Sequence, residues 1–179
     1  MIYEFDSKRP SIHPTAYVSE SATIIGDVQI GAYCYVGPGA VIRADAKPII
    51  IDDETAVEDG VIIHAGGPQC KACYIGKRVT IGHGAIIHGN LLSAGSNIGM
   101  GAIISIYAEV GEYAVVAEGA VVKKGQKIPP RVVVGGTPAV ILRELQAKDI
   151  AAWEKSKDIY VELAKKCCIP GMLKRIDQE

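Results

Sequence analysis

Residues 92–128 read LSAGSNIGMGAIISIYAEVGEYAVVAEGAVVKKGQKI and place a branched apolar residue at every sixth position. The same period extends back to Ile12, with a frame shift after Pro48, a longer connection after Ile63 and a one-residue deletion before Leu92. A small side chain, most often alanine, lies four positions after most of these anchors. The nineteen anchors are Ile12, Val18, Ile24, Ile30, Val36, Ile42, Ile51, Val57, Ile63, Ile75, Ile81, Ile87, Leu92, Ile98, Ile104, Val110, Val116, Val122 and Ile128.

A strict six-residue period predicts a coil of short strands. A bulky anchor alternates with a small residue because three strands that meet in a triangular cross-section leave little interior volume. Each buried anchor contributes about 1.5–3 kcal/mol, so a single coil is unstable and the coils have to stack. A sandwich or barrel would instead show period-two alternation. We therefore predict an all-β solenoid of about six coils, with Gly or Asn at corners that need a positive φ.

The residues after the period predict a different element. Pro129-Pro130 ends the strand pattern, and Thr137-Pro138 predicts a helix start, with threonine as the cap and proline in the first turn. Apolar residues then recur at helical spacing over residues 148–168. The sequence thus predicts a β-helix domain over residues 1–136 and a C-terminal helical segment over residues 137–179, packed along the solenoid.

Composition and charge exclude several classes of partner. The net charge is −1 and the isoelectric point about 6.4, so we expect no binding to nucleic acid. No apolar run approaches the roughly 20 residues of a membrane-spanning helix, and no signal peptide is recognisable at the start. Five cysteines at irregular spacing do not predict a disulfide framework. We expect a cytoplasmic protein.

Three of the four histidines predict a metal site. His64 and His88 each directly follow an anchor, and they fall on the same face one coil apart if the segment after His64 is a corner with an extra six-residue loop. His83 lies on the preceding face, so it meets the other two only if a second copy of the chain supplies it. Three neutral imidazoles with one open position form a catalytic Zn²⁺-type site. His13 we interpret as structural.

Two segments resemble the γ-class carbonic anhydrases and their carnitine-operon, phenylacetate-operon and ferripyochelin-binding-type relatives, which belong to the hexapeptide-repeat proteins. They are VIRADAKPIIIDDETAVEDGVIIHA, residues 41–65, and TIGHGAIIHGN, residues 80–90. The resemblance implies a left-handed parallel β-helix and a homotrimer. It also implies that metal sites lie between subunits, with ligands at His64, His83 and His88.

The same resemblance implies roles for four polar residues near the metal. Arg43 and Asp45 match an interface pair beside the metal, which a bidentate Arg–carboxylate contact would preorganise. Asp59 matches another polar position of the site. Glu58 stands where the prototype enzymes have glutamine, and a carboxylate there could orient or deprotonate metal-bound water.

The activity implied is reversible hydration of CO₂ to bicarbonate by metal-bound hydroxide, a carbonate dehydratase reaction. The segment 65–74 lacks the acidic proton shuttle of the prototype, so this activity would be weak. Zn²⁺, Fe²⁺ and Co²⁺ all suit imidazole ligands. The alternatives are a metal-dependent acyl-CoA thioesterase, a CoA-dependent acyltransferase, for which the tail at residues 134–139 is typical, and a non-catalytic trimeric metal-binding scaffold.

Overall fold

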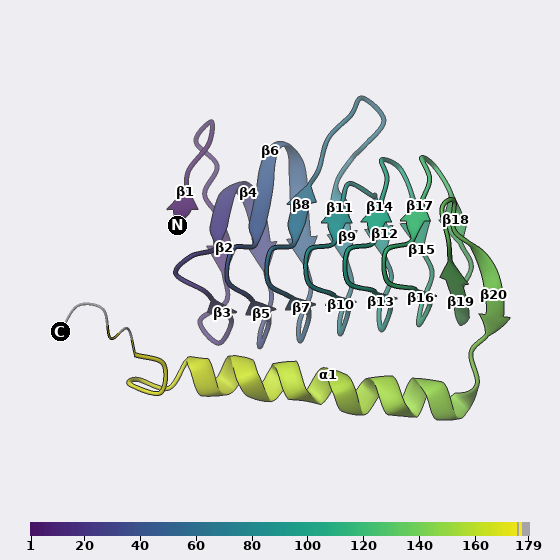
Figure 1. Ribbon diagram of the computed structural model, residues 1–179. Helices are drawn as coiled ribbons and strands as arrows, with labels where there is room; N and C mark the ends of the chain where they lie inside the picture. The colour runs from purple at the N-terminus through teal and green to yellow at the C-terminus, as the bar shows by residue number, and fades with distance from the viewer. Residues whose placement is uncertain (175, 177–179) are drawn as a thin grey trace.

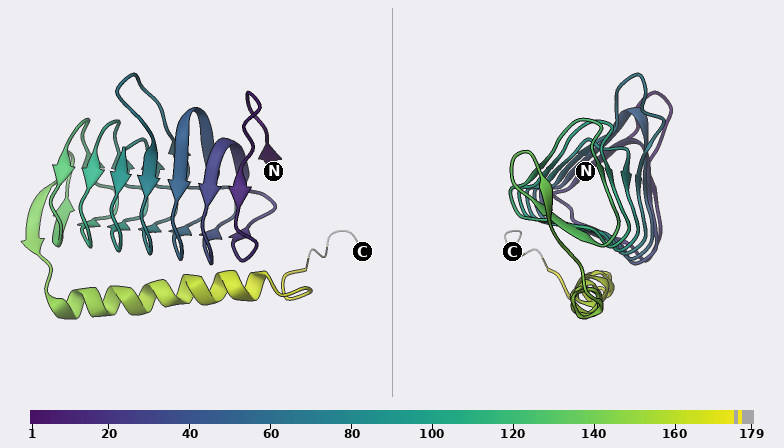
Figure 2. Two further views of the ribbon diagram at one scale, coloured as in Figure 1. Left: turned by 180° about the vertical axis from the view of Figure 1, so that it is seen from behind. Right: turned by 90° about the vertical axis from the view of Figure 1, so that its right-hand side faces the viewer.

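The computed structural model describes residues 1–174 and residue 176. Its strands form a parallel solenoid of about seven turns, slightly more than the hexad count predicts, and one long helix follows it (Figure 1). Seen end-on, the coils stack as triangles around a common interior (Figure 2). The structure therefore confirms the predicted left-handed β-helix with a C-terminal helix.

The strands lie on three faces, two of which belong to one continuous sheet. The twelve-stranded sheet contains β1 (Ile2–Tyr3), β2 (Ser11–Ile12), β4 (Thr23–Ile30), β6 (Val41–Ile51), β8 (Ile62–His64), β9 (Cys73–Ile75), β11 (Ile86–Ile87), β12 (Leu91–Leu92), β14 (Ile103–Ile104), β15 (Glu109–Val110), β17 (Val121–Val122) and β18 (Lys127–Ile128). The eight-stranded sheet contains β3 (Tyr17–Val18), β5 (Tyr35–Val36), β7 (Ala56–Val57), β10 (Thr80–Ile81), β13 (Asn97–Ile98), β16 (Val115–Val116), β19 (Val132–Gly135) and β20 (Val140–Glu144).

The hexad anchors form the core. Anchors pair with anchors in neighbouring coils, as Ile63 with Ile87 and Ile81 with Ile98, and nearly all are at most 4% exposed. The small residues of the repeat, such as Ala85 and Ala102, are also fully buried and fill the space between anchors. Strand β6 runs around a corner and pairs with β8 through its first half and with β9 through its second half, which explains the frame shift after Pro48.

The corners differ from the expectation that Gly or Asn occupies them. Glycines with positive φ do stack along one corner, at Gly39, Gly60, Gly84, Gly101 and Gly119. Along another corner the left-handed conformation is adopted by larger residues, namely Tyr33, Glu54, Arg78, Tyr113 and Arg131. No Asn among the described residues has a positive φ. These long side chains reach the C-terminal helix and one another, and those contacts offset the cost of a left-handed non-glycine backbone.

The predicted helix start at Thr137-Pro138 is wrong. Residues 140–144 instead form β20, which pairs antiparallel with β19 and closes the last coil. Helix α1 spans Ala147–Cys167. It begins after Gln146, whose backbone N–H donates to the Asp149 carboxylate at 2.9 Å. The cap-like Thr-Pro pair therefore lies in a turn between two strands, where local sequence cannot distinguish a hairpin from a helix entry.

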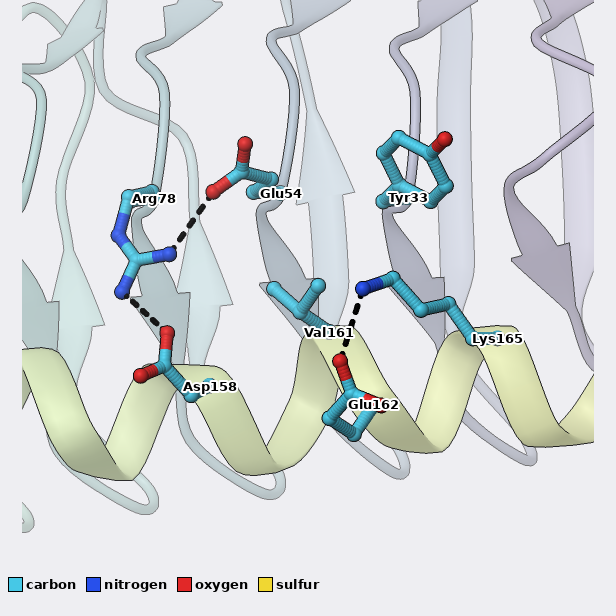
Figure 3. A pocket seen from close by; sticks show the side chains of 7 residues that line it. All are labelled: Tyr33, Glu54, Arg78, Asp158, Val161, Glu162 and Lys165. Carbon is cyan, nitrogen blue, oxygen red and sulfur yellow. Dashed lines mark hydrogen bonds and ion pairs between the residues drawn. The ribbon is translucent and has the colours of Figure 1, made fainter.

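Helix α1 runs lengthwise along the solenoid and packs on β3, β5 and β7 (Figure 1). The Arg78 guanidinium connects the two elements, because it donates to Glu54 on a solenoid corner and to Asp158 on the helix, each at 2.8 Å (Figure 3). It also donates to Glu154 on the helix at 2.8 Å. No helix in the described part of the chain is long and apolar enough to cross a membrane.

Lys157 is the most unusual contact of this helix. Its side chain is 2% exposed and its ammonium donates to the Asn97 side-chain oxygen at 2.8 Å and to the Ser96 carbonyl at 3.4 Å. Burial lowers the pKa of Lys157 from 10.5 to about 8, against the opposing charge of Glu154. A lysine pKa that is lower in the folded state means that the unfolded chain binds more protons between pH 8 and 10.5, so this group makes stability rise with pH across that window.

We expect Lys157→Met to remove this pH dependence. The unfolding free energy of the wild type should rise relative to that of the variant by about 2–3 kcal/mol between pH 8 and 10.5, as measured by denaturant unfolding at each pH. A difference that stays constant over this range would contradict the assignment. Lys155→Met, on the same helix but at an exposed position, is the matched control.

Candidate functional site

His64 and His88 lie side by side on adjacent coils, as the register predicts. Ile63 in β8 pairs with Ile87 in β11, and both anchors are buried. His64 and His88 directly follow these anchors and therefore point outward. Their ring centroids are 4.9 Å apart with the planes inclined by 35°. The strict hexad register alone is what brings the two imidazoles together.

Arg43 and Asp45 flank this pair from the preceding coil. Arg43 in β6 pairs in register with His64 in β8. The Asp45 Oδ1 atom lies 3.1 Å from His64 Nε2, and its Oδ2 accepts a hydrogen bond from Arg43. Burial acts in the opposite direction, but the hydrogen bonds from Arg43 and His64 lower the pKa of Asp45. The carboxylate is therefore held ionised beside His64.

The Nε2 atom of His88 is buried and has no hydrogen-bond partner among the described residues. Burial, followed by the charges of His64 and Arg43, lowers the pKa of His88 and favours its neutral form. The Gly66 backbone covers both rings: a Cβ on Gly66 would lie 3.5 Å from His88 Nε2 and 3.7 Å from His64 Nε2. Both Nε2 atoms thus lie near Gly66. His64 Nε2 already contacts Asp45, whereas His88 Nε2 has no partner that would satisfy it, and an electrophile or a cation could.

His83 lies on a different corner, after β10 of the eight-stranded sheet. Its Nε2 is 3.0 Å from Glu58 Oε2, and its backbone N–H donates to the same oxygen at 3.1 Å. Its Nδ1 is 3.6 Å from Asp59 Oδ2. Because Glu58 is only 6% exposed, the pair forms a fixed imidazole–carboxylate arrangement of the kind that orients a general base.

A pocket of about 610 Å³ opens beside His83. Glu58 and His83 line it together with the apolar side chains of Met100, Val115 and Trp153. Trp153 belongs to helix α1, so the helix contributes to this site. Trp153 was not predicted as a site residue, because nothing in its spacing distinguishes it from an ordinary packing residue. The Gly-Gly-Pro run after His64 is a sequence signal that could have indicated a close approach of the Gly66 backbone to the histidines.

The structure places the predicted residues in two half-sites. One comprises Arg43, Asp45, His64 and His88, and the other comprises Glu58, Asp59 and His83. Across the described ranges 1–174 and 176, no group of three or more His, Cys, Asp or Glu side chains is arranged to hold a metal ion. A single copy therefore offers two imidazoles to a metal, and a third ligand would have to come from another copy.

Comparisons with known proteins agree with this architecture. Residues 9–44 match the bacterial transferase hexapeptide family. The chain is 35% identical to the carnitine operon protein CaiE of Escherichia coli over 166 residues, which cover 92% of this chain and 83% of CaiE. It is 37% identical to a crystal structure from Bacillus cereus that carries the provisional description of an acetyltransferase, with a TM-score of 0.88 over 92% of this chain and 95% of that one.

An acetyltransferase from Vibrio cholerae that contains hexapeptide repeats, solved with acetyl coenzyme A, is 26% identical with a TM-score of 0.53, over 65% of this chain and 70% of that one. This chain therefore belongs to the bacterial hexapeptide-repeat transferase family. Proteins of this family are typically trimers.

The predicted carbonate dehydratase is corrected by these comparisons. The structural relatives are described as acetyltransferases rather than as lyases. The assignment to carbonic anhydrases depended on three histidines and a few flanking residues, whereas the coil that carries them is shared with the transferases. Hydration of CO₂ is therefore withdrawn as the activity of this chain.

The environment of His88 makes a prediction for NMR. We expect its imidazole to titrate below the ordinary value of about 6.5, because burial and the Arg43 charge both oppose protonation. Arg43→Gln should move the midpoint upward while leaving the pair in place. A His88 resonance that titrates at or above the ordinary value in the wild type, or that is unaffected by Arg43→Gln, would contradict this picture.

Proposed function

We propose that this chain is a CoA-dependent acyltransferase that works as a trimer, with His83 as its general base. The observation that carries the proposal is the His83–Glu58 pair in the lining of the 610 Å³ pocket. Family membership and the relative solved with acetyl coenzyme A support a thioester as the acyl donor. A pocket with apolar walls and one imidazole–carboxylate pair suits a neutral thioester and an amine or hydroxyl acceptor.

The geometry assigns a nitrogen to the base. His83 Nε2 lies 3.0 Å from Glu58 Oε2, so we assign the ring proton to Nε2, and His83 Nδ1 is then the atom that accepts a proton. It takes the proton from the acceptor amine or hydroxyl as that group attacks the thioester carbonyl carbon. The carbon–sulfur bond then breaks, and the CoA thiolate leaves and takes up the proton from His83. Glu58 keeps the imidazole oriented throughout and stabilises its cationic form.

A trimer would place the two half-sites against each other. Next to His64 and His88, the outward side chains of Ile62, Ile86 and Ile103 form a registered ladder and are 44%, 41% and 36% exposed. An exposed apolar ladder of this kind favours contact with another protein surface. Contact of this face with the His83 corner of a second copy would close the site between subunits, so that the acyl group lies between the two half-sites.

The acyltransferase proposal is tested by acyl-CoA turnover. Release of the CoA thiol from acetyl-CoA, measured with a panel of small amines and hydroxyl acceptors, should fall by about a hundredfold or more in His83→Ala. His13 is an exposed histidine at the corner after β2, and His13→Ala should have the same turnover as the wild type. Unchanged turnover in His83→Ala, or no acceptor-dependent turnover in the wild type, would overturn the proposal.

A second candidate, metal-dependent hydrolysis of a thioester, has support from the unpartnered His88 Nε2. The donor set fits a divalent ion such as Zn²⁺, Fe²⁺ or Co²⁺ in part, because His64 and His88 direct neighbouring nitrogens at one space. His83 of a second copy would supply the third imidazole. A metal bound there would provide Lewis-acid activation, and Glu58 would orient His83. His64 Nε2 would bind the ion only after giving up its contact with Asp45 Oδ1.

Metal content separates the two candidates. If a metal is held between subunits, anaerobically purified protein should contain one ion per chain, and His64→Ala, His83→Ala and His88→Ala should each lose it. Co-assembly of equal amounts of His83→Ala and His88→Ala chains should restore about a quarter of the sites, because random mixing leaves that fraction with intact ligands. Metal-free wild-type protein with full, chelator-resistant turnover would rule this candidate out.

A further inference from the structure

The loop of residues 65–72, which connects β8 to β9, covers the His64–His88 pair. It rises above the other corners of the solenoid (Figure 1). Gly66 is buried within it, and a Cβ at that position would lie 3.2 Å from His64 Cε1. The backbone is thus so close to the imidazoles that no substituent larger than hydrogen fits between them without movement.

Tyr107 supports this loop from the next coils. A Cβ on Gly67 would lie 2.5 Å from the Tyr107 hydroxyl oxygen and 2.7 Å from Ile106 Cδ1, so the loop backbone rests directly on these two side chains. The Gln69 backbone N–H points to the same hydroxyl at 3.5 Å. Lys124 Nζ lies over the ring, 5.8 Å from its centroid. The tyrosine therefore contacts both the loop and Lys124.

The Tyr107 backbone shows that this support carries a conformational cost. Its φ is +64°, in the left-handed region that favours glycine. A tyrosine there costs about 1 kcal/mol or more relative to glycine. Close packing of its ring against Gly67 is the contact that glycine at this position could not make. The unfavourable backbone conformation of Tyr107 thus accompanies a contact that holds the loop in place.

We propose that Tyr107 holds the loop of residues 65–72 closed over the histidine pair, and that the closed loop restricts the site to short acyl groups. The second half of this inference depends on the proposed acyl transfer. With the loop down, Gly66 blocks the space above both rings, so an acyl chain can extend only alongside the rings. We expect acetyl to be accepted with the loop in place and a longer chain to displace it.

Two cysteines provide a readout that needs no activity. Cys70 lies in the loop and is 3% exposed, whereas Cys168 at the end of α1 is exposed. If Tyr107 holds the loop, Tyr107→Gly should increase the rate of Cys70 alkylation by a maleimide about tenfold or more. Cys168 in the same molecules should react at an unchanged rate, as followed by peptide mass spectrometry.

Further variants separate loop release from misfolding. Glycine at position 107 relieves the left-handed backbone, so its effect cannot be attributed to backbone strain. Tyr107→Phe removes only the hydroxyl, which is the Tyr107 atom nearest Gly67 and the acceptor of the Gln69 N–H, so Cys70 should react at a rate between those of the wild type and Tyr107→Gly. Gly67→Ala attacks the same contact from the loop side and should expose Cys70 as Tyr107→Gly does. An unchanged Cys70 rate in both Tyr107→Gly and Gly67→Ala would overturn the proposed role of Tyr107.

Acyl-chain preference tests the size limit. We expect the wild type to have a higher kcat/KM for acetyl-CoA than for hexanoyl-CoA. Tyr107→Gly should reduce this ratio of kcat/KM values about tenfold or more, and Tyr107→Phe should give a ratio between the two. A ratio that does not change although Cys70 becomes reactive would overturn the size limit alone. A wild type that turns over no acyl-CoA would remove the proposed function and the size limit with it, while the labelling would still decide whether Tyr107 holds the loop.

Discussion

Every coil of this protein buries one branched side chain on each face, and the burial is complete only when another coil lies next to it. Ile24, Ile63, Ile87 and Val122 have no solvent exposure because anchors stack on anchors at every level. A coil removed from the stack would expose its anchors and leave its strand amides unpaired. Stacking therefore sets the register, and the register sets the position of every outward side chain.

The candidate site is a consequence of that register. A residue directly after an anchor points outward at the same height as its counterpart one coil away, which is why His64 and His88 lie 4.9 Å apart. His83 follows its anchor by two positions on another corner, and there it meets Glu58 instead. One copy of the chain thus carries the predicted residues in two separate groups, which the proposed trimer would bring together at a boundary between copies.

Helix α1 and the loop of residues 65–72 are the parts that the repeat does not dictate. The helix contributes Trp153 to the pocket beside His83 and buries Lys157 against Asn97. The loop brings Gly66 against the imidazoles and Gly67 against Tyr107. Both elements contact the solenoid through individual residues that do not belong to the six-residue repeat. They therefore make this chain differ from a uniform stack of coils.

The sequence by itself determined the solenoid, the face shared by His64 and His88, and the separation of His83 from them, because a period of six leaves one arrangement that buries all anchors. It also indicated the long helix, but not its start, since Thr137-Pro138 satisfies a turn as well as a cap and only the pairing of β20 with β19 decides between them. The motif around the histidines led to a lyase, because residues that a scaffold shares across a family do not specify its reaction. Only the tertiary structure decided the Glu58–His83 contact, the cover over His88 and the support by Tyr107, because these depend on distances between coils that are remote in sequence.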